Sequence, residues 1–211
     1  MVNKKENVFL IKGVAFNVII SLLFSFFISI GTFLIIIFNK ETSLSKLMIF
    51  DNIDRLAIAI LLLIIFYKYQ DNYKIKERLI LNIKFSPSVV YFSIFSLITF
   101  NCLFYFSNHE INGKMYLYVV ISMLLTGISE EIVYRVISMN LYKDFSLLTI
   151  VAQGLIFALI GHGGINDLQN NILIRFPLGV ILGLIYKKTN NLWYGSVAHG
   201  MYNTAVYINL I

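Results

Sequence analysis

The chain has 211 residues, of which 58% are hydrophobic and only 13% are charged, and its mean hydropathy is +0.79. This composition is typical of an integral membrane protein and excludes a separate soluble domain, so we predict a single membrane domain over residues 1–211. The net charge of +6 does not indicate nucleic acid as a partner, because the basic residues are scattered over short loops. The single cysteine, Cys102, excludes a disulfide framework.

Long uncharged stretches predict the membrane-spanning helices. About 20 apolar residues cross a hydrocarbon core of about 30 Å, and several stretches reach this length. The predicted spans are residues 13–38, 56–67, 85–107, 115–142, 145–161, 171–186 and 190–211. The stretch at 56–67 has only 12 apolar residues, so a helix lying at the interface is the alternative there. We therefore predict an all-α, polytopic transmembrane bundle of about seven helices.

The distribution of lysine and arginine predicts the orientation in the membrane. With the N-terminus in the cytoplasm, the cytoplasmic segments hold eleven of these residues and the external segments hold four. The positive-inside rule favours this arrangement. Residues 13–38 follow a basic start but precede no small-residue cleavage site, so we expect a retained anchor and not a signal peptide. The composition, rich in lysine, asparagine and isoleucine, leads us to expect a bacterial plasma membrane.

Three ionisable side chains lie within residues 129–135, at the end of fifteen uncharged residues. A charge at the centre of a bilayer costs roughly 2.5–3.5 kcal/mol on insertion scales, so charges kept there indicate a functional site. On a helix Glu131 and Arg135 share one face and can pair, whereas Glu130 points about 100° away and is left free as a proton acceptor. The alternative is that these groups are solvated at the membrane–water boundary.

Two histidines and an asparagine in later spans are candidates to complete this site. His162 ends the fifth predicted span, beside a glycine turn. His199 lies in the middle of the last span, and Asn203 follows four residues later on the same helical face. Small residues flank His199 and would allow another helix to approach closely. They are Gly195, Ser196, Ala198 and Gly200. His109 lies in a polar loop, where we expect it to be solvated.

Two chemistries suit these residues. In the first, Glu130 and His162 activate a water while His199 and Asn203 donate hydrogen bonds to a developing oxyanion, which hydrolyses a peptide bond without a covalent intermediate or a cofactor. In the second, Glu130, His162 and His199 hold zinc as a two-histidine, one-glutamate set. The sequence contains no H-E-x-x-H helix to support the zinc alternative.

The order of these motifs resembles a known family. Glu130-Glu131-x-x-x-Arg135 is followed by a phenylalanine-containing helix that ends in His162 and then by His199-x-x-x-Asn203. This series is similar to the CPBP family, which comprises the type II CAAX prenyl endopeptidases and the bacteriocin-processing or bacteriocin-immunity (Abi) proteins. The resemblance covers about residues 116–207.

The resemblance implies an intramembrane protease with a peptide or a lipidated protein as its substrate in the bilayer. Its catalytic core would lie in residues 113–211, and residues 1–112 would form additional N-terminal membrane helices. Glu130 and His162 would activate the water, and His199 with Asn203 would form the oxyanion site. Glu131 with Arg135 would organise the motif.

Two features of the sequence bear on whether this site assembles. The family spacing is F-x-x-x-H, but five positions separate Phe157 from His162, which rotates the histidine by about 100° on an ideal helix. Either Gly161 absorbs the extra residue as a bulge or break, or the site is degraded.

The depths of the two residues in the membrane also differ. Glu130 lies about 22 Å down its helix from Met115, whereas His162 is at the far end of the next span. The two meet only with a break near Gly127 or an inward shift of the fifth span.

We therefore expect an intramembrane endopeptidase that acts on a membrane-associated or lipidated peptide. A second hypothesis is a non-catalytic bacteriocin self-immunity or membrane adaptor protein on the same scaffold, which the altered spacing before His162 favours. A third, a small proton-coupled carrier, is disfavoured because the sequence has no internal repeat.

Overall fold

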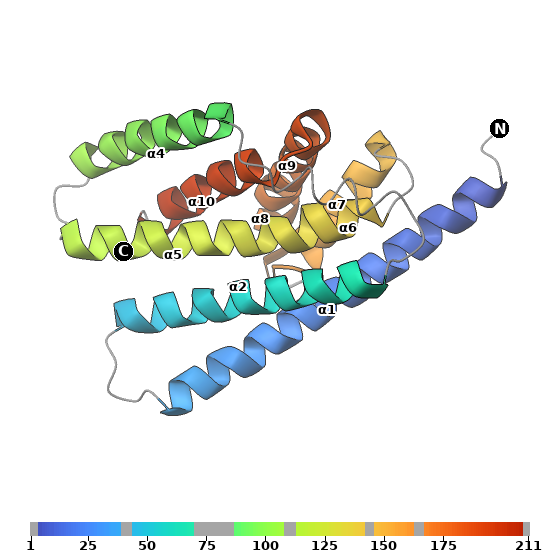
Figure 1. Ribbon diagram of the computed structural model, residues 1–211, viewed down its shortest axis with the longest axis horizontal. Coiled ribbons are helices and arrows are strands. Elements are labelled where there is room, and N and C mark those ends of the chain that lie inside the picture. Colours follow the sequence, from blue (N-terminus) through green and yellow to red (C-terminus); the bar gives the residue numbers. More distant parts are fainter. Residues whose placement is uncertain are drawn as a thin grey trace.

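The computed structural model describes residues 4–38, 44–69, 87–107, 113–141, 146–162 and 167–208, and all regular structure in these ranges is helical (Figure 1). The elements are α1 (Lys4–Phe38), α2 (Leu44–Tyr69), α4 (Pro87–Ser107), α5 (Gly113–Glu131), the π-helix η1 (Ile132–Ile137), α6 (Ser138–Asn140), α7 (Leu147–Leu159), α8 (Leu168–Asn170), the π-helix η3 (Asn171–Arg175), α9 (Phe176–Thr189) and α10 (Leu192–Ile208). Consecutive segments form continuous helices in two places: α5 with η1 and α6, and α8 with η3 and α9. The described ranges therefore contain seven continuous helices. The all-α prediction of about seven helices is confirmed.

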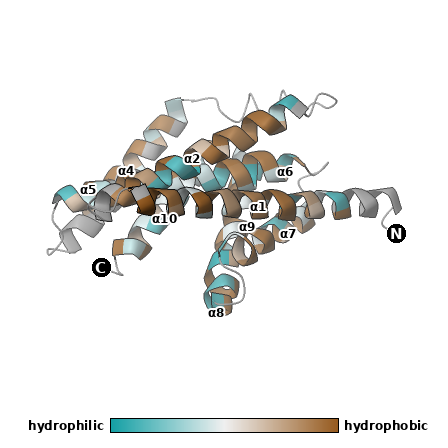
Figure 2. Cartoon of the chain, turned by 90° about the horizontal axis from the view of Figure 1, so that it is seen from below, coloured by the Kyte–Doolittle hydropathy of each residue, from teal (hydrophilic) through white to brown (hydrophobic). Residues whose placement is uncertain are grey.

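Three helical stretches of the described chain are long and apolar enough to cross a membrane, by length and composition. They are Ile11–Ile37, Gly113–Asn140 and Leu168–Thr189. Figure 2 shows apolar residues along most of the first of these, α1. The apolar helices make this a multi-pass membrane protein. The predicted fifth span is shorter than expected, because α7 has only 13 residues and a length of about 20 Å, less than a bilayer core.

The predicted span at 56–67 is only the second half of α2, which begins twelve residues earlier at Leu44. The predicted start of this span is too late, because charged residues precede residue 56 and interrupt the uncharged stretch. In the structure two of these charges, Asp51 and Arg55, are paired: Arg55 Nε lies 2.8 Å from Asp51 Oδ2, and the other Asp51 oxygen accepts a hydrogen bond from Thr32 of α1. Paired charges are compatible with a helix inside a helical bundle, so the helix continues through them.

Helix α5 lies at the centre of the bundle, between α2 and α10 (Figure 1). It is continuous through Gly127, so the expected break there is absent. A Cβ atom on Gly127 would lie 2.8 Å from both the Ser196 carbonyl oxygen and the Gly200 amide nitrogen of α10. The glycine therefore allows two helix backbones to touch, as the small residues around His199 predict.

A buried hydrogen-bond network joins α5 to α2. The Asn52 side-chain amide donates to Ser122 Oγ over 2.5 Å, and its carbonyl oxygen accepts from Thr126 Oγ1. Interhelical hydrogen bonds of this kind stabilise helix packing in a membrane, where lipid tails are as apolar as the side chains and no hydrophobic effect drives the helices together. Because Thr126 is one turn before Glu130, this network sets the position of the acidic motif.

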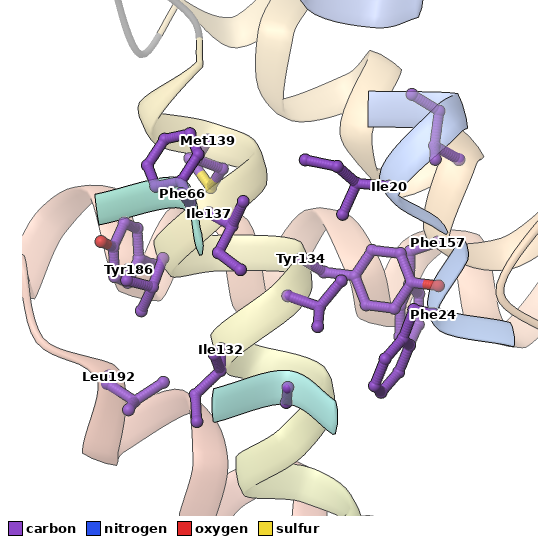
Figure 3. Packing of buried hydrophobic residues seen from close by; sticks show 14 of the residues in the cluster. Ile20, Phe24, Phe66, Ile132, Tyr134, Ile137, Met139, Phe157, Tyr186 and Leu192 are labelled. Atoms are coloured by element: carbon purple, nitrogen blue, oxygen red, sulfur yellow. The ribbon is translucent and has the colours of Figure 1, made fainter. Parts of the chain in front are cut away.

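The hydrophobic core is built around η1 (Figure 3). Every residue from Ser129 to Asn140 is buried. Figure 3 shows Tyr134 beside Phe24 of α1 and Phe157 of α7, and the Tyr134 ring centroid lies 6.4 Å and 5.2 Å from theirs. A π-helix is rare and frequently occurs at functional sites. Here it begins directly after the two glutamates, at the point where α1, α2, α7 and α10 converge.

Candidate active site

The two glutamates at the end of α5 are buried, and in the described chain only Glu131 is paired with an arginine. Glu131 is 1% exposed and Arg135 is fully buried, and Arg135 Nε lies 3.3 Å from Glu131 Oε2. The pair expected from the spacing is therefore present. The alternative of groups solvated at the membrane boundary is wrong for these side chains. Glu130 is also buried, and its Oε2 makes no hydrogen bond to the described residues.

His199 of α10 lies between the two glutamates. Its Nδ1 is 3.1 Å from Glu131 Oε1, and its Nε2 is 3.5 Å from Glu130 Oε2. A carboxylate only accepts hydrogen bonds, so Nδ1 donates to Glu131 and Nε2 faces Glu130. A Cβ atom on Gly195 would lie 2.7 Å from Glu131 Oε2, so this glycine lets α10 approach the carboxylate closely.

His162 approaches the same oxygen of Glu130 from the turn after α7. Its Nε2 lies 3.7 Å from Glu130 Oε2, and its Nδ1 lies 3.0 Å from the Phe157 carbonyl oxygen. The carbonyl accepts, so Nδ1 carries the proton and the Nε2 lone pair of the neutral ring faces Glu130. Burial, the largest effect, lowers the pKa of His162 below its ordinary 6.5 and favours this neutral form.

The turn after α7 absorbs the extra residue before His162. The amides of Ile160 and Gly161 both donate to the Ile156 carbonyl oxygen, over 2.9 and 3.3 Å, and the chain then leaves the helix. The His162 ring packs on the Phe157 ring with centroids 4.5 Å apart. A Cβ atom on Gly161 would lie 2.7 Å from the Phe157 carbonyl oxygen and would also meet the Tyr134 hydroxyl. Of the two outcomes expected for this spacing, the structure shows the break at Gly161.

Helix α7 resolves the expected mismatch of depth between Glu130 and His162. Gln153 and Phe157 of α7, and Gly161 in the turn after it, all meet the first turn of η1. The helix therefore crosses η1 and does not run alongside it, so distances counted along two parallel spans do not apply. The two predicted residues meet although α5 is unbroken.

Sequence reasoning missed Gln153. Its Oε1 accepts a hydrogen bond from Arg135 Nη1 over 2.6 Å, and the side chain is fully buried. The signal was available, because Gln153 is the one side chain with an amide group within the apolar residues 145–161. A neutral amide carries no charge, so charge patterns along the spans do not identify it. Phe157 contributes as well, since its ring lies 5.3 Å from Arg135 Cζ and 5.5 Å from the His199 ring.

The structure thus brings five of the predicted residues together and leaves one beside them. Glu130, Glu131, Arg135, His162 and His199 form one cluster. Asn203 lies one turn beyond His199 on α10 and is partly exposed. No hydrogen bond or ion pair between Asn203 and this cluster is present among the residues that the structure describes.

Within the described ranges, no group of three or more histidine, cysteine or carboxylate side chains is arranged to hold a metal ion. Zinc bound by Glu130, His162 and His199 stays a prediction, and metal analysis of the purified protein would test it.

Comparison with known proteins agrees with the motifs. Residues 112–205 match the family described as type II CAAX prenyl endopeptidase Rce1-like. The matched segment contains all the site residues named above, from Glu130 to Asn203. Neither a curated protein nor a solved structure matches the chain. The resemblance predicted over residues 116–207 is confirmed by this match over residues 112–205.

Proposed function

We propose that this protein is an intramembrane endopeptidase, because residues 112–205 match a family described as type II CAAX prenyl endopeptidase Rce1-like. It hydrolyses a peptide bond of a membrane-associated or lipidated peptide with a water activated by Glu130 and His162. One observation carries the proposal. A single buried oxygen, Glu130 Oε2, faces Nε2 of His199 at 3.5 Å and Nε2 of His162 at 3.7 Å.

Glu130 Oε2 has no hydrogen-bond partner among the described residues. Direct N–H···O hydrogen bonds measure about 2.7–3.2 Å, so neither histidine contact is a direct bond. A water bound beside this oxygen and the two imidazoles would supply the missing partner. Such a water would donate one proton to Glu130 and the other to the free Nε2 of His162. Its oxygen lone pair is then available for attack.

The reaction proceeds through a tetrahedral intermediate. The water oxygen forms a bond to the carbonyl carbon of the substrate while Glu130 takes a proton. The carbonyl oxygen becomes an oxyanion. Glu130 then returns the proton to the amide nitrogen as the carbon–nitrogen bond breaks. The products are a new carboxyl group and a new amine, and the enzyme returns to its starting state.

His199 stabilises the oxyanion when its ring carries both protons, because Nδ1–H is already donated to Glu131. The Asn203 amide, one turn along α10, supplies a second donor once the substrate is bound.

The substrate class follows from the surroundings of the site. His162 is the most exposed member of the cluster, with 22% of its side chain accessible, so the scissile bond approaches from the turn after α7. Apolar helices surround this region, which suits a peptide held at the membrane by a lipid or by its own apolar residues. We propose a bacterial plasma membrane with the N-terminus in the cytoplasm as the setting.

The test is cleavage of a prenylated reporter peptide by the full chain in proteoliposomes. Glu130→Gln should lower kcat about 10²- to 10⁴-fold, the range for loss of a general base. Asp54→Asn is the matched control, because it makes the same carboxyl-to-amide change in α2 and should leave kcat within about twofold. Unimpaired cleavage by Glu130→Gln would exclude this glutamate as the base.

The second candidate is a non-catalytic self-immunity or adaptor protein. The extra residue before His162 was its support in the sequence. This argument weakens, because His162 faces Glu130 despite the spacing. The double variant Glu130→Gln/His199→Ala separates the two candidates in a cellular complementation assay. An adaptor tolerates both changes if the protein still inserts, and a protease does not.

A further inference from the structure

Behind the proposed catalytic residues, a continuous series of polar contacts runs from α7 through the π-helix to α10. Gln153 Oε1 accepts from Arg135 Nη1 over 2.6 Å, and Arg135 Nε lies 3.3 Å from Glu131 Oε2. The other oxygen of Glu131 lies 3.1 Å from His199 Nδ1. The other ring nitrogen of His199, Nε2, faces Glu130. The series ends at the oxygen that we propose to be the general base.

Each contact in this series limits the freedom of the next. A guanidinium has five donors in a rigid plane, so fixing two of them fixes the orientation of the whole group. Arg135 then holds one oxygen of Glu131, which directs the other toward α10. His199 must present Nδ1–H to that oxygen, and this selects which ring nitrogen is left for chemistry. The orientation of His199 therefore depends on the orientation of Arg135.

We infer that Gln153 is a positioning residue for His199, acting through Arg135 and Glu131. The inference rests on the proposed function, since it assigns Gln153 a part in the same reaction. Arg135 Nη1 has a second acceptor, the carbonyl oxygen of Tyr134, but at a longer 3.3 Å. In the described residues Gln153 is the hydrogen-bond acceptor that reaches Arg135 from another helix.

The chemistry of the amide explains why glutamine suits this place. Its carbonyl oxygen accepts a hydrogen bond from the guanidinium without adding a negative charge. A carboxylate there would compete with Glu131 for Arg135, whereas an apolar side chain would leave a buried donor unsatisfied, at a cost of about 1–3 kcal/mol. Gln153 is fully buried on the same face of α7 as Phe157, which packs against Arg135 and both histidines.

The experiment measures the state of the His199 ring independently of activity. Ring nitrogen resonances are recorded for nitrogen-15 histidine-labelled protein in detergent micelles, and they are assigned with His109→Asn and His162→Asn variants. The wild type should show a protonated Nδ1 at His199. Gln153→Leu, which keeps the volume and removes the acceptor, should shift the Nδ1 resonance, because Glu131 then presents its oxygen to His199 in a less fixed position. Gln153→Glu, whose carboxylate would compete with Glu131 for Arg135, should also change the Nδ1–H signal.

Cleavage kinetics provide the second measurement. Gln153→Leu should lower kcat about 10- to 100-fold with KM within about twofold, which is the pattern of a residue that orients a reacting group from behind. Asn140→Leu is the matched control. It removes another buried amide, bonded to the Val136 carbonyl oxygen and the Tyr186 hydroxyl, and should change neither kcat nor the His199 signal.

The two proposals fail in different ways. If Gln153→Leu keeps both the His199 signal and kcat, or if Asn140→Leu changes them as much, Gln153 has no positioning role while the protease function stands. If the wild-type protein does not cleave the reporter at all, the proposed function is wrong. The ring nitrogen spectra of the same variants then decide the positioning role alone.

Discussion

Two regions of the molecule contain the same local pattern, an acid followed four residues later by arginine, with a second acid nearby. The sets are Asp51, Asp54 and Arg55 in α2, and Glu130, Glu131 and Arg135 at the junction of α5 and η1. In α2 the paired side chains of Asp51 and Arg55 are 20% and 29% exposed. At the junction both paired side chains are at most 1% exposed, and α7 and α10 supply further partners.

The comparison teaches that spacing along a helix creates an ion pair but does not decide its role. In α2, Asp51 pairs with Arg55 and accepts a hydrogen bond from Thr32 of α1. The charged pair therefore stabilises the packing of α1 against α2. At the junction, the pair is joined to a histidine and a glutamine from other helices, and Glu130 is left facing two imidazoles. What distinguishes a structural ion pair from a candidate site is therefore the set of side chains that distant segments place around the pair.

The largest expected difference is in stability. Arg135→Leu leaves Glu131 buried without its cation and should lower the free energy of unfolding by about 3–5 kcal/mol. Arg55→Leu removes a partly exposed pair and should cost at most about 1 kcal/mol. Denaturation of both variants in detergent micelles measures the difference. Equal losses would show that burial does not distinguish the two pairs.

The next difference is in catalysis. Glu131→Gln replaces a charge-assisted hydrogen bond to His199 by a neutral one and should lower kcat about 30-fold, equivalent to about 2 kcal/mol. Asp51→Asn makes the corresponding change in α2 and should leave kcat within about twofold. Peptide cleavage in proteoliposomes is the measurement. A similar loss in both variants would point to a general effect on the fold.

Two glycines sharpen the comparison further. A Cβ atom on Gly161 would meet the Phe157 carbonyl oxygen, which is backbone and cannot move freely, whereas a Cβ atom on Gly31 would meet only the movable carboxylate of Asp54. We expect Gly161→Ala to cost about 1–3 kcal/mol of stability and to displace His162, and Gly31→Ala to cost less than about 1 kcal/mol. Denaturation together with kcat measures both. If Gly161→Ala is as mild as Gly31→Ala, the described turn is wrong.

The smallest expected effect is a shift in pH dependence. Burial lowers the pKa of His162, so its neutral, proton-accepting form persists below the ordinary value of 6.5. Protonation removes the free lone pair, so kcat/KM should fall on the acid side with a midpoint below pH 6.5. Rates measured from pH 4 to 9 test this. An acid limb centred above pH 6.5 would contradict the neutral form of His162 proposed here.

Much of the site could be read from local patterns. The Glu131–Arg135 pair follows from the helical repeat, since residues four apart share a face. The small residues around His199 predict close packing, and the structure places Gly200 and Ser196 against Gly127. In contrast, the boundary of α2 was misplaced, because spans were predicted from uncharged stretches and paired charges do not end a helix.

The geometry around His162 could not be predicted in the same way. Whether one extra residue degrades the motif depends on the space beside Gly161, and this space is set by Tyr134 on another helix. The role of Gln153 could not be predicted for the same reason. An amide in an apolar helix can be assigned a role only when its hydrogen-bond partner, here Arg135, is known. Such contacts join residues far apart in the chain, where no helical repeat relates them.

The amino-acid sequence by itself determined that this protein is an all-α membrane protein and which residue types carry its chemistry, because hydropathy and the helical repeat act over a few turns. The tertiary structure decided that α7 crosses the π-helix and that the turn at Gly161 carries His162 to Glu130. It also decided that His199 is held between two carboxylates. These features depend on how separate helices pack, and packing is set by the shapes of side chains that meet only in the folded chain.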